Sequence, residues 1–208
     1  MPLIRKGPGA PVGDTPLDLA AAAVALRRGA ASERWTAARA LGADPSGAGP
    51  LGEALSAEDD EGVREAIFTS LARIGTAQSV DAVLPHLAAD DSNLRTGALD
   101  ALRAMIGAVR PRLPGLLAGP DADVRLLSCE LVRDLPSAEA AVLLGPVLDG
   151  DPEANVCAAA IDVLAEIGDA SAQPALERCA VRFAGQPFLV FAIRTAVDRI
   201  STARDPHG

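Results

Sequence analysis

The sequence predicts an all-α solenoid, in which helix pairs stack into one elongated array. Three observations predict it: an internal repeat of about 31 residues, apolar residues at helical spacing within each repeat, and acidic or glycine residues where helices begin or end. The composition agrees, with 49% hydrophobic but only 2% aromatic residues. Small aliphatic side chains favour close packing of helices, so the core is expected to consist of Ala, Leu, Val and Ile.

The repeat is visible wherever an apolar residue precedes a basic position. The apolar position is held in turn by Val63, Leu94, Val124 and Val156, at intervals of 31, 30 and 32 residues. A weaker copy begins at Glu33, which lies 30 residues before Val63. A unit of this size cannot cover its own apolar face, so neighbouring units must stack.

Each unit is predicted to contain two helices. In the clearest copy the first helix has apolar residues at Val63, Ala66, Ile67, Leu71 and Ile74, and the second has them at Val80, Val83, Leu84 and Leu87. Gly75 lies between them and is expected in the left-handed conformation that ends a helix. Prolines late in the second helices are expected to kink them and to curve the array, at Pro85, Pro114 and Pro146.

Acidic residues precede each first helix and predict where it begins. They fall at Asp59-Asp60, Asp90-Asp91, Asp121 and Asp151. A carboxylate at this place can accept hydrogen bonds from the free N–H groups of the first turn and meets the positive end of the helix dipole. Asp151-Pro152 is the clearest start, because proline suits the first helical position. The alternative is an edge that attracts cations, and helix capping is the interpretation we favour.

A single domain is expected between residues 15 and 200, with a helix closing each end. Thr15-Pro16 followed by Leu17–Arg28 predicts the opening helix, and the apolar pattern of Pro187–Ile200 predicts the closing one. Residues 1–14 and 201–208 are expected to be flexible tails, the first because it is rich in Pro and Gly.

The run from Asp60 to Gly75, with its copies, resembles the HEAT-like repeats first grouped with the phycobilin lyases. The resemblance spans roughly residues 32–180. It implies a right-handed α-solenoid of about five HEAT-like helix pairs with capping helices at both ends. It is poor evidence for activity, because such repeats occur in lyases, hydroxylases, DNA glycosylases and pure scaffolds.

The net charge of -9 and the pI near 4.7 argue against nucleic acid as a partner, because a polyanion is repelled by an acidic protein. The N-terminus has no apolar stretch of the kind that signal peptides need, and the Ala-rich run before Arg27 and Arg28 is too short to span a membrane. We expect a cytoplasmic protein that does not bind membranes. The abundance of Ala, Gly, Pro and Arg indicates a bacterial source.

Neither a metal site nor a cofactor site is predicted, and no catalytic residue is assigned. Cys129, Cys157 and Cys179 are odd in number and have no CxxC spacing, and the only histidines are His86 and His207. Cys157 stands where the other copies have arginine. A buried thiol is the interpretation we favour there, since a reactive one needs basic neighbours to lower its pKa.

The basic position of the first four copies forms a ladder, which we call the arginine ladder: Arg34, Arg64, Arg95 and Arg125. One interpretation is a surface that binds an anion or an acidic partner. The other, which we favour, is that each arginine pairs with the acidic segment beside it or in the next unit.

Two features fit the repeat badly. The segment around residues 103–112 shortens the link between two helices and gathers three arginines in an acidic protein, namely Arg103, Arg110 and Arg112. It is either a docking patch for an acidic partner or, as we favour, a solvated turn. Three of the four phenylalanines lie near the C-terminus, namely Phe183, Phe188 and Phe191. We expect them in the core of the closing helix rather than exposed as an anchor for a partner.

The function predicted from these patterns is a non-enzymatic scaffold or adaptor that binds another protein, with a bacterial signalling protein such as a kinase or response regulator as the partner we favour. Curvature normally leaves the second helices on the concave side, where exposed polar residues would line a groove. The predicted partner-binding residues are Asp81, His86, Arg110, Arg112, Glu139 and Glu177. Arg110 and Arg112 are expected to be the strongest anchors, because guanidinium groups bind carboxylates bidentately.

Two enzymatic alternatives stay open. The family resemblance allows a phycobilin lyase-like enzyme, although the absence of Tyr and the scarcity of His leave few groups to orient a tetrapyrrole. It also allows a HEAT-like DNA glycosylase, for which Trp35 near Arg34 and Arg39 is the only local hint and which the net charge opposes.

Overall fold

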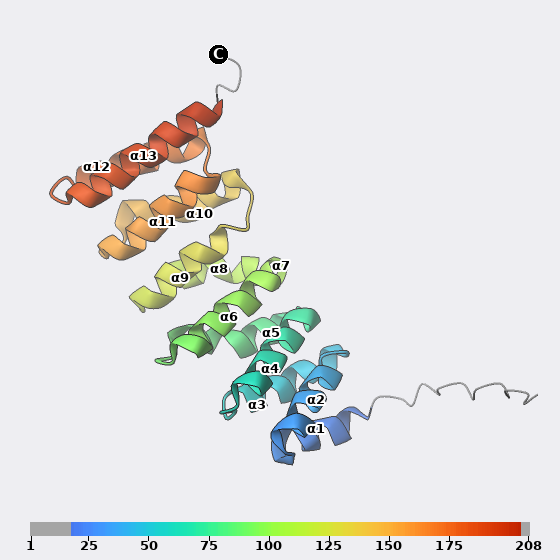
Figure 1. Ribbon diagram of the computed structural model, residues 1–208. Coiled ribbons are helices and arrows are strands. Elements are labelled where there is room, and N and C mark those ends of the chain that lie inside the picture. The colour runs from blue at the N-terminus through green and yellow to red at the C-terminus, as the bar shows by residue number, and fades with distance from the viewer. Residues whose placement is uncertain (1–17, 205–208) are drawn as a thin grey trace, which may run out of the picture.

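The computed structural model describes residues 18–204, which form an elongated α-solenoid (Figure 1). The array opens with α1 (Leu19–Arg28) and closes with α13 (Pro187–Arg204). The first helices of the five pairs between them are α2 (Ala31–Leu41), α4 (Glu61–Ile74), α6 (Ser92–Ala104), α9 (Ala122–Val132) and α11 (Ala154–Ile167). The second helices are α3 (Ala48–Leu55), α5 (Ala77–Val83), α7 (Ile106–Val109) with α8 (Leu113–Leu117), α10 (Ser137–Gly150) and α12 (Gln173–Arg182).

Short 3-10 helices join these elements, namely η1 (Pro45–Gly47), η2 (Leu84–Ala88), η3 (Arg110–Arg112) and η4 (Ala170–Ala172). The predicted fold class is therefore confirmed: five helix pairs with a closing helix at each end. The closing helix continues beyond Ile200 to Arg204, so the boundary predicted at residue 200 is four residues short. The predicted tail 1–14, residues 205–208 and His207 lie outside the described residues.

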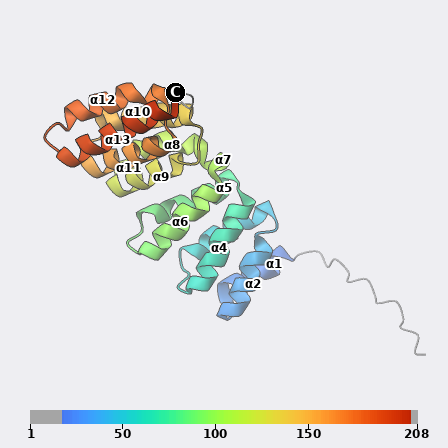
Figure 2. The same cartoon turned by 45° about the horizontal axis from the view of Figure 1, so that its top comes forward.

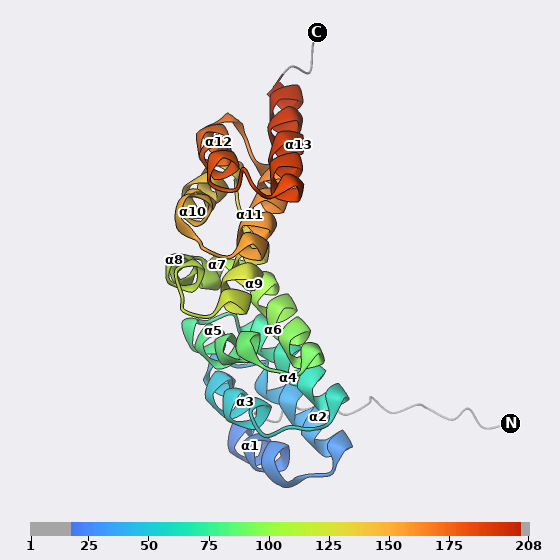
Figure 3. The same cartoon turned by 90° about the vertical axis from the view of Figure 1, so that its left-hand side faces the viewer.

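The helices form two layers (Figure 3). One contains α2 and the other first helices together with α13, and the other contains the second helices together with α1, which packs on α3. In Figure 3 the array bends with the second helices on its outer side, so the prediction that they line the concave side is wrong. The first helices pack on one another through buried alanines such as Ala66, Ala98 and Ala160, whereas the layer of second helices contains Pro85, Pro114 and Pro146.

Most of the predicted helix starts are confirmed. Asp60, Asp91 and Asp121 each accept a hydrogen bond from a backbone N–H group in the first turn of the helix that follows, at 2.8–3.0 Å. Asp151 differs, because its carboxylate accepts from the Glu153 N–H at 2.9 Å and pairs with Arg125 of the preceding unit, while α11 begins only at Ala154. The prediction that Pro152 is the first helical position is therefore wrong.

The predicted turn at Gly75 is confirmed, since this residue ends α4 in the left-handed region with φ 62°. The prolines act in three different ways. Pro85 is the second residue of the 3-10 helix that follows α5, Pro114 lies in the first turn of α8, and Pro146 lies inside α10. Pro114 is thus placed where its ring is tolerated and does not come late in a helix as predicted.

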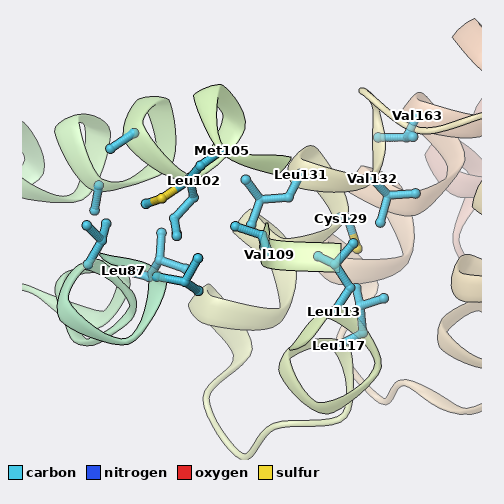
Figure 4. Packing of buried hydrophobic residues seen from close by; sticks show 14 of the residues in the cluster. Leu87, Leu102, Met105, Val109, Leu113, Leu117, Cys129, Leu131, Val132 and Val163 are labelled. Carbon is cyan, nitrogen blue, oxygen red and sulfur yellow. The ribbon is translucent and has the colours of Figure 1, made fainter. Parts of the chain in front are cut away.

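The array is irregular within its third pair, at a place that we call the junction, where α6 runs into α7 with only Met105 between them. The contact between α6 and α9 is sparser than that between other neighbouring first helices, and the array changes direction there (Figure 2). The hydrophobic core nevertheless continues through this junction. In Figure 4 the buried side chains of Val109 and Leu131 lie between those of Leu102 and Leu113.

Candidate functional site

The arginine ladder holds the loops of the array in place. The Arg34 guanidinium donates to both oxygens of Glu58, at 2.8 and 2.7 Å, and to the Gly29 carbonyl. The Arg125 guanidinium does the same with Asp151, at 2.6 and 3.1 Å, in a buried site. The interpretation as structural ion pairs is therefore confirmed for these residues.

The ladder is incomplete at the junction. Arg64 donates to the Glu58 carbonyl at 2.6 Å and to the Asp91 carboxylate at 2.9 Å, which ties its unit to the next. Arg95 donates only to the carbonyls of Ala89 and Asp90, and within residues 18–204 it forms no ion pair. The missing link coincides with the sparse contact between α6 and α9.

These ion pairs lower the pKa values of their carboxyl groups. The hydrogen bond from Arg34 holds the pKa of Glu58 below its usual range. Burial acts to raise the pKa of Asp151, but the hydrogen bonds from Arg125 and from the Glu153 backbone N–H, together with the charges of Arg125 and Arg182, outweigh it and the pKa is lowered. Both groups are therefore ionised at neutral pH, as structural ion pairs require.

Cys157 is fully buried, as we expected, and its Sγ lies 3.6 Å from the Asp151 carbonyl oxygen. A hydrogen bond with Cys179 and burial raise the pKa of the Cys157 thiol. The guanidinium group that the ladder lacks here comes from α12, because Arg182 donates to the carbonyls of Leu148 and Asp151. A residue from the following helix thus replaces the missing ladder arginine.

Four of the six predicted partner-binding residues form ion pairs between second helices. Arg112 Nη2 lies 2.7 Å from Asp81 Oδ1 of α5, and Arg110 Nε lies 2.5 Å from Glu139 Oε1 of α10. Arg103, the third arginine of the irregular segment, pairs with Asp134. These arginines are therefore engaged within the protein rather than held free for a partner.

The other two predicted residues are not brought together with them. His86 is only 9% exposed and packs edge-on against Phe68, with the ring centroids 6.2 Å apart, so its prediction as an exposed groove residue is wrong. Burial first, and the nearby Arg64 second, lower the pKa of His86. Glu177 is exposed on α12. The six residues do not form one continuous site.

A groove lies on the opposite layer, between the first helices α4 and α6, and has a volume of about 880 Å³. We call it the first-helix groove. Its floor is apolar and consists of Phe68, Ala72, Leu94, Gly97 and Ala101. A Cβ atom at Gly97 would lie 2.7 Å from the Phe68 ring, so the ring packs directly against the α6 backbone. Gly97 is thus the residue that lets Phe68 form this floor.

The charged rim of the first-helix groove contains three carboxylates and two guanidinium groups. Arg64 is bound as described above, and Arg73 donates to the carbonyls of Gly42 and Arg39, at 2.9 and 2.7 Å. Glu61 accepts a hydrogen bond from Asn93. Among the described residues, Glu65 and Asp100 form no ion pair. The unpaired charge of the groove is therefore acidic.

The polar pattern of the second helices gave no indication of this groove. A signal was nevertheless present in the repeat, because the position of Gly97 is held by alanine or leucine in the other copies, namely Ala66, Leu127 and Ala159. Glycine weakens a helix by about 1 kcal/mol relative to alanine, and at this position the close contact with Phe68 accounts for it.

The described surface also exposes apolar side chains. Phe188 and Phe191 are 55% and 71% exposed on α13, and Phe183 is half-buried beneath the Arg182 guanidinium, so the prediction of a phenylalanine core is wrong for the first two. The inner face of α13 is filled by Leu189, Ile193, Ala196 and Ile200. A second, smaller groove of about 550 Å³ between α8 and α10 includes the 74% exposed Val142.

Two kinds of site are not seen within residues 18–204. No cluster of His, Cys, Asp and Glu has the arrangement that a metal ion needs. None of the described helices combines the length and the apolar character that crossing a membrane requires.

The family model for HEAT repeats matches residues 19–103 and 109–182, on either side of the junction. A comparison with curated proteins found no match. One similar solved structure is the archaeal HEAT-like repeats protein from Thermococcus onnurineus NA1, with TM-score 0.49 and 16% identity over 88% of this chain and 87% of that one.

A designed armadillo repeat protein is also similar, with TM-score 0.42 and 16% identity over 88% of this chain and 100% of that one. So is the complex of CpcE and CpcF of phycocyanin lyase from Nostoc sp. PCC7120, with TM-score 0.37 and 16% identity over 96% of this chain and 100% of that one. The family match covers well over half of the chain, which therefore belongs to the HEAT repeat family.

Proposed function

We propose that this HEAT repeat protein is a non-enzymatic scaffold or adaptor that binds another protein in the first-helix groove. The observation that carries the proposal is the groove itself, which combines an apolar floor with unpaired carboxylates on the inner side of the bend. Concave surfaces with an apolar centre and a few polar groups are the usual form of a binding site. The inner side of a curved repeat array is also where such proteins hold extended partners.

The first-helix groove is a better candidate than the second-helix residues predicted from the sequence. A partner that used Arg110 or Arg112 would first have to break an existing ion pair with Glu139 or Asp81. The gain from a new pair would then be offset by the loss of the old one. Glu65 and Asp100 need no such exchange.

We further propose a bacterial signalling protein as the partner and the cytoplasm as the location, supported by the composition and by the lack of a membrane-spanning helix within the described chain. The enzymatic alternatives gain no support from the grooves. Trp35, the hint of a glycosylase cleft, lies on α2 with the Arg39 guanidinium 4.9 Å from its ring centre and lines neither groove.

Affinity capture from the native host tests the proposal. Thr69 is exposed and lines the first-helix groove, so Thr69→Trp fills the groove without disturbing the core. Ala138→Trp on α10 is the matched control, since it adds the same side chain at an exposed position outside both grooves. We expect the wild type and Ala138→Trp to capture the same protein and Thr69→Trp to lose it. Equal capture by all three would place the interface elsewhere.

A further inference from the structure

We infer that the first-helix groove takes a linear segment of the partner protein in which a lysine or arginine side chain lies beside a bulky apolar one. This inference rests on the proposed function and specifies the partner chemistry. It follows from the shape of the groove, from the nature of its floor and from the charges on its walls.

The walls supply the charge. Glu65 stands on the α4 wall and Asp100 on the α6 wall, and both are exposed. The guanidinium groups of Arg64 and Arg73 are held by carbonyl groups of the chain and, for Arg64, also by Asp91. A cationic side chain entering the groove therefore meets two carboxylates that are free to pair with it.

The net charge of the molecule acts in the same direction. At -9 it attracts basic segments and repels acidic ones over a distance of about 8–10 Å at physiological salt. An acidic partner, which was one of the two interpretations of the arginine-rich segment, is disfavoured at this groove.

The floor supplies the apolar contact. Phe68 is 6% exposed and lines the groove together with Ala72 of its own helix and with Leu94 and Ala101 of α6. An apolar side chain placed there covers this floor and is itself removed from water. A cation alone would leave the floor uncovered, so the two side chains are needed together.

The size of the groove requires a linear segment. A volume of about 880 Å³ lies within the range of sites that hold small ligands, and it accommodates a few side chains but not a folded element. The groove follows two neighbouring helices and is open to solvent. A short extended segment can place a basic and an apolar side chain in it.

A short peptide with the sequence Leu-Ile-Arg-Lys between Gly-Ser flanks is the probe, followed by fluorescence anisotropy. Glu65→Lys combined with Asp100→Lys reverses both free charges of the groove. Glu53→Lys combined with Asp198→Lys makes the same change in net charge at exposed positions on α3 and α13. We expect the groove variant to weaken binding about tenfold or more and the control to weaken it by about twofold, through the long-range field alone.

A second probe separates the two contributions. The peptide Leu-Ile-Glu-Glu keeps the apolar pair and should not bind, and Ser-Ser-Arg-Lys keeps the charges and should bind about tenfold more weakly than the full probe. Equal loss in the groove and control variants, or binding of the acidic peptide as tight as that of the basic one, would overturn the inference. Circular dichroism and the melting temperature establish that each variant is folded.

The chain itself has a segment of this chemistry outside the described residues, from Leu3 to Lys6. A variant lacking residues 1–14 tests whether that segment competes. We expect an unchanged affinity for the probe. An increase of about tenfold would instead assign the groove to the N-terminal segment of the same chain and overturn its assignment to a partner.

Failure of this inference can be told apart from failure of the proposed function. If Thr69→Trp abolishes capture of a host protein while the basic peptide does not bind, the groove is a protein-binding site of different chemistry. Only the inference is then overturned. If Thr69→Trp leaves capture intact, the site itself is wrong.

Discussion

Single arginine side chains join neighbouring units of this array. How much each ion pair contributes to the stability of the protein depends on how deeply it is buried. The Arg125–Asp151 pair is removed from water, and each of its charges is held by two hydrogen bonds. The Arg112–Asp81 pair is about half-exposed. Water and salt screen an exposed pair, whereas a buried charge that loses its partner has no substitute.

This difference predicts unequal effects of two substitutions. Asp151→Ala leaves the buried Arg125 guanidinium without its carboxylate and should lower the free energy of unfolding by about 3–5 kcal/mol. Asp81→Ala should lower it by less than about 1 kcal/mol. Urea denaturation of both variants measures this, and equal losses would contradict the assignment of Asp151 as the more important partner.

We expect the stability of the protein to depend on pH because of the buried His86. Burial and the nearby Arg64 lower its pKa in the folded protein, whereas the unfolded chain has the ordinary value of about 6.5. The unfolded chain therefore takes up a proton that the folded protein does not, and stability is full above about pH 6.5 and falls as the pH drops below it. Urea denaturation between about pH 7.5 and pH 5.5 should show this loss, and His86→Gln should remove it; an unchanged slope would show that His86 is not responsible.

At the scale of elements, the spacing of α4 and α6 creates the first-helix groove. The two helices meet where the Phe68 ring lies against Gly97. A glycine inside a helix is unfavourable by itself, so its presence is explained by the contact that it permits. The neighbouring unit boundaries have no such arrangement of ring and glycine.

Substitution of two glycines by alanine tests this explanation. At Gly97 the new Cβ would lie 2.7 Å from the Phe68 ring, and the displaced ring should destabilise the protein by about 1–3 kcal/mol. At Gly115 in α8 the same Cβ meets no atom within 4 Å, and the substitution should stabilise by up to about 1 kcal/mol. Thermal and urea denaturation report the sign, and a stabilising Gly97→Ala would show that the contact is not tight.

Several elements were predictable because local chemistry determines them. The Asp60, Asp91 and Asp121 caps and the turn at Gly75 depend only on residues a few positions away. His86 was misplaced because Leu84–Ala88 forms a 3-10 helix, which has about 3.0 residues per turn instead of 3.6 and so rotates His86 to another face. The first-helix groove depends on how two units pack, which no local pattern contains.

At the scale of the whole molecule, the junction divides the array into two halves that match the family separately, at residues 19–103 and 109–182. Arg95 has no carboxylate partner there among the described residues, and α6 contacts α9 sparsely. The ion pairs of Arg103 with Asp134 and of Arg112 with Asp81 join the halves. In repeat proteins each unit is stabilised mainly by its neighbours, so a weak boundary limits cooperativity.

In native-state hydrogen exchange, a destabilising substitution in one half should therefore lower the protection of amides mainly in that half. Leu164→Ala removes a fully buried side chain from α11 and should lower the protection of amides after residue 109 by about 2–4 kcal/mol. The amides before residue 103 should lose less than half of that. An equal loss in both halves would show that the array unfolds as one cooperative unit.

The central claim is that a partner protein binds the first-helix groove, and NMR chemical-shift mapping with the captured partner tests it most directly. The account predicts that shift changes in the labelled protein concentrate on α4 and α6, around Glu65, Phe68, Gly97 and Asp100. Changes concentrated instead on the second helices, around the Arg110 and Arg112 ion pairs, or on the exposed phenylalanines of α13, would contradict it.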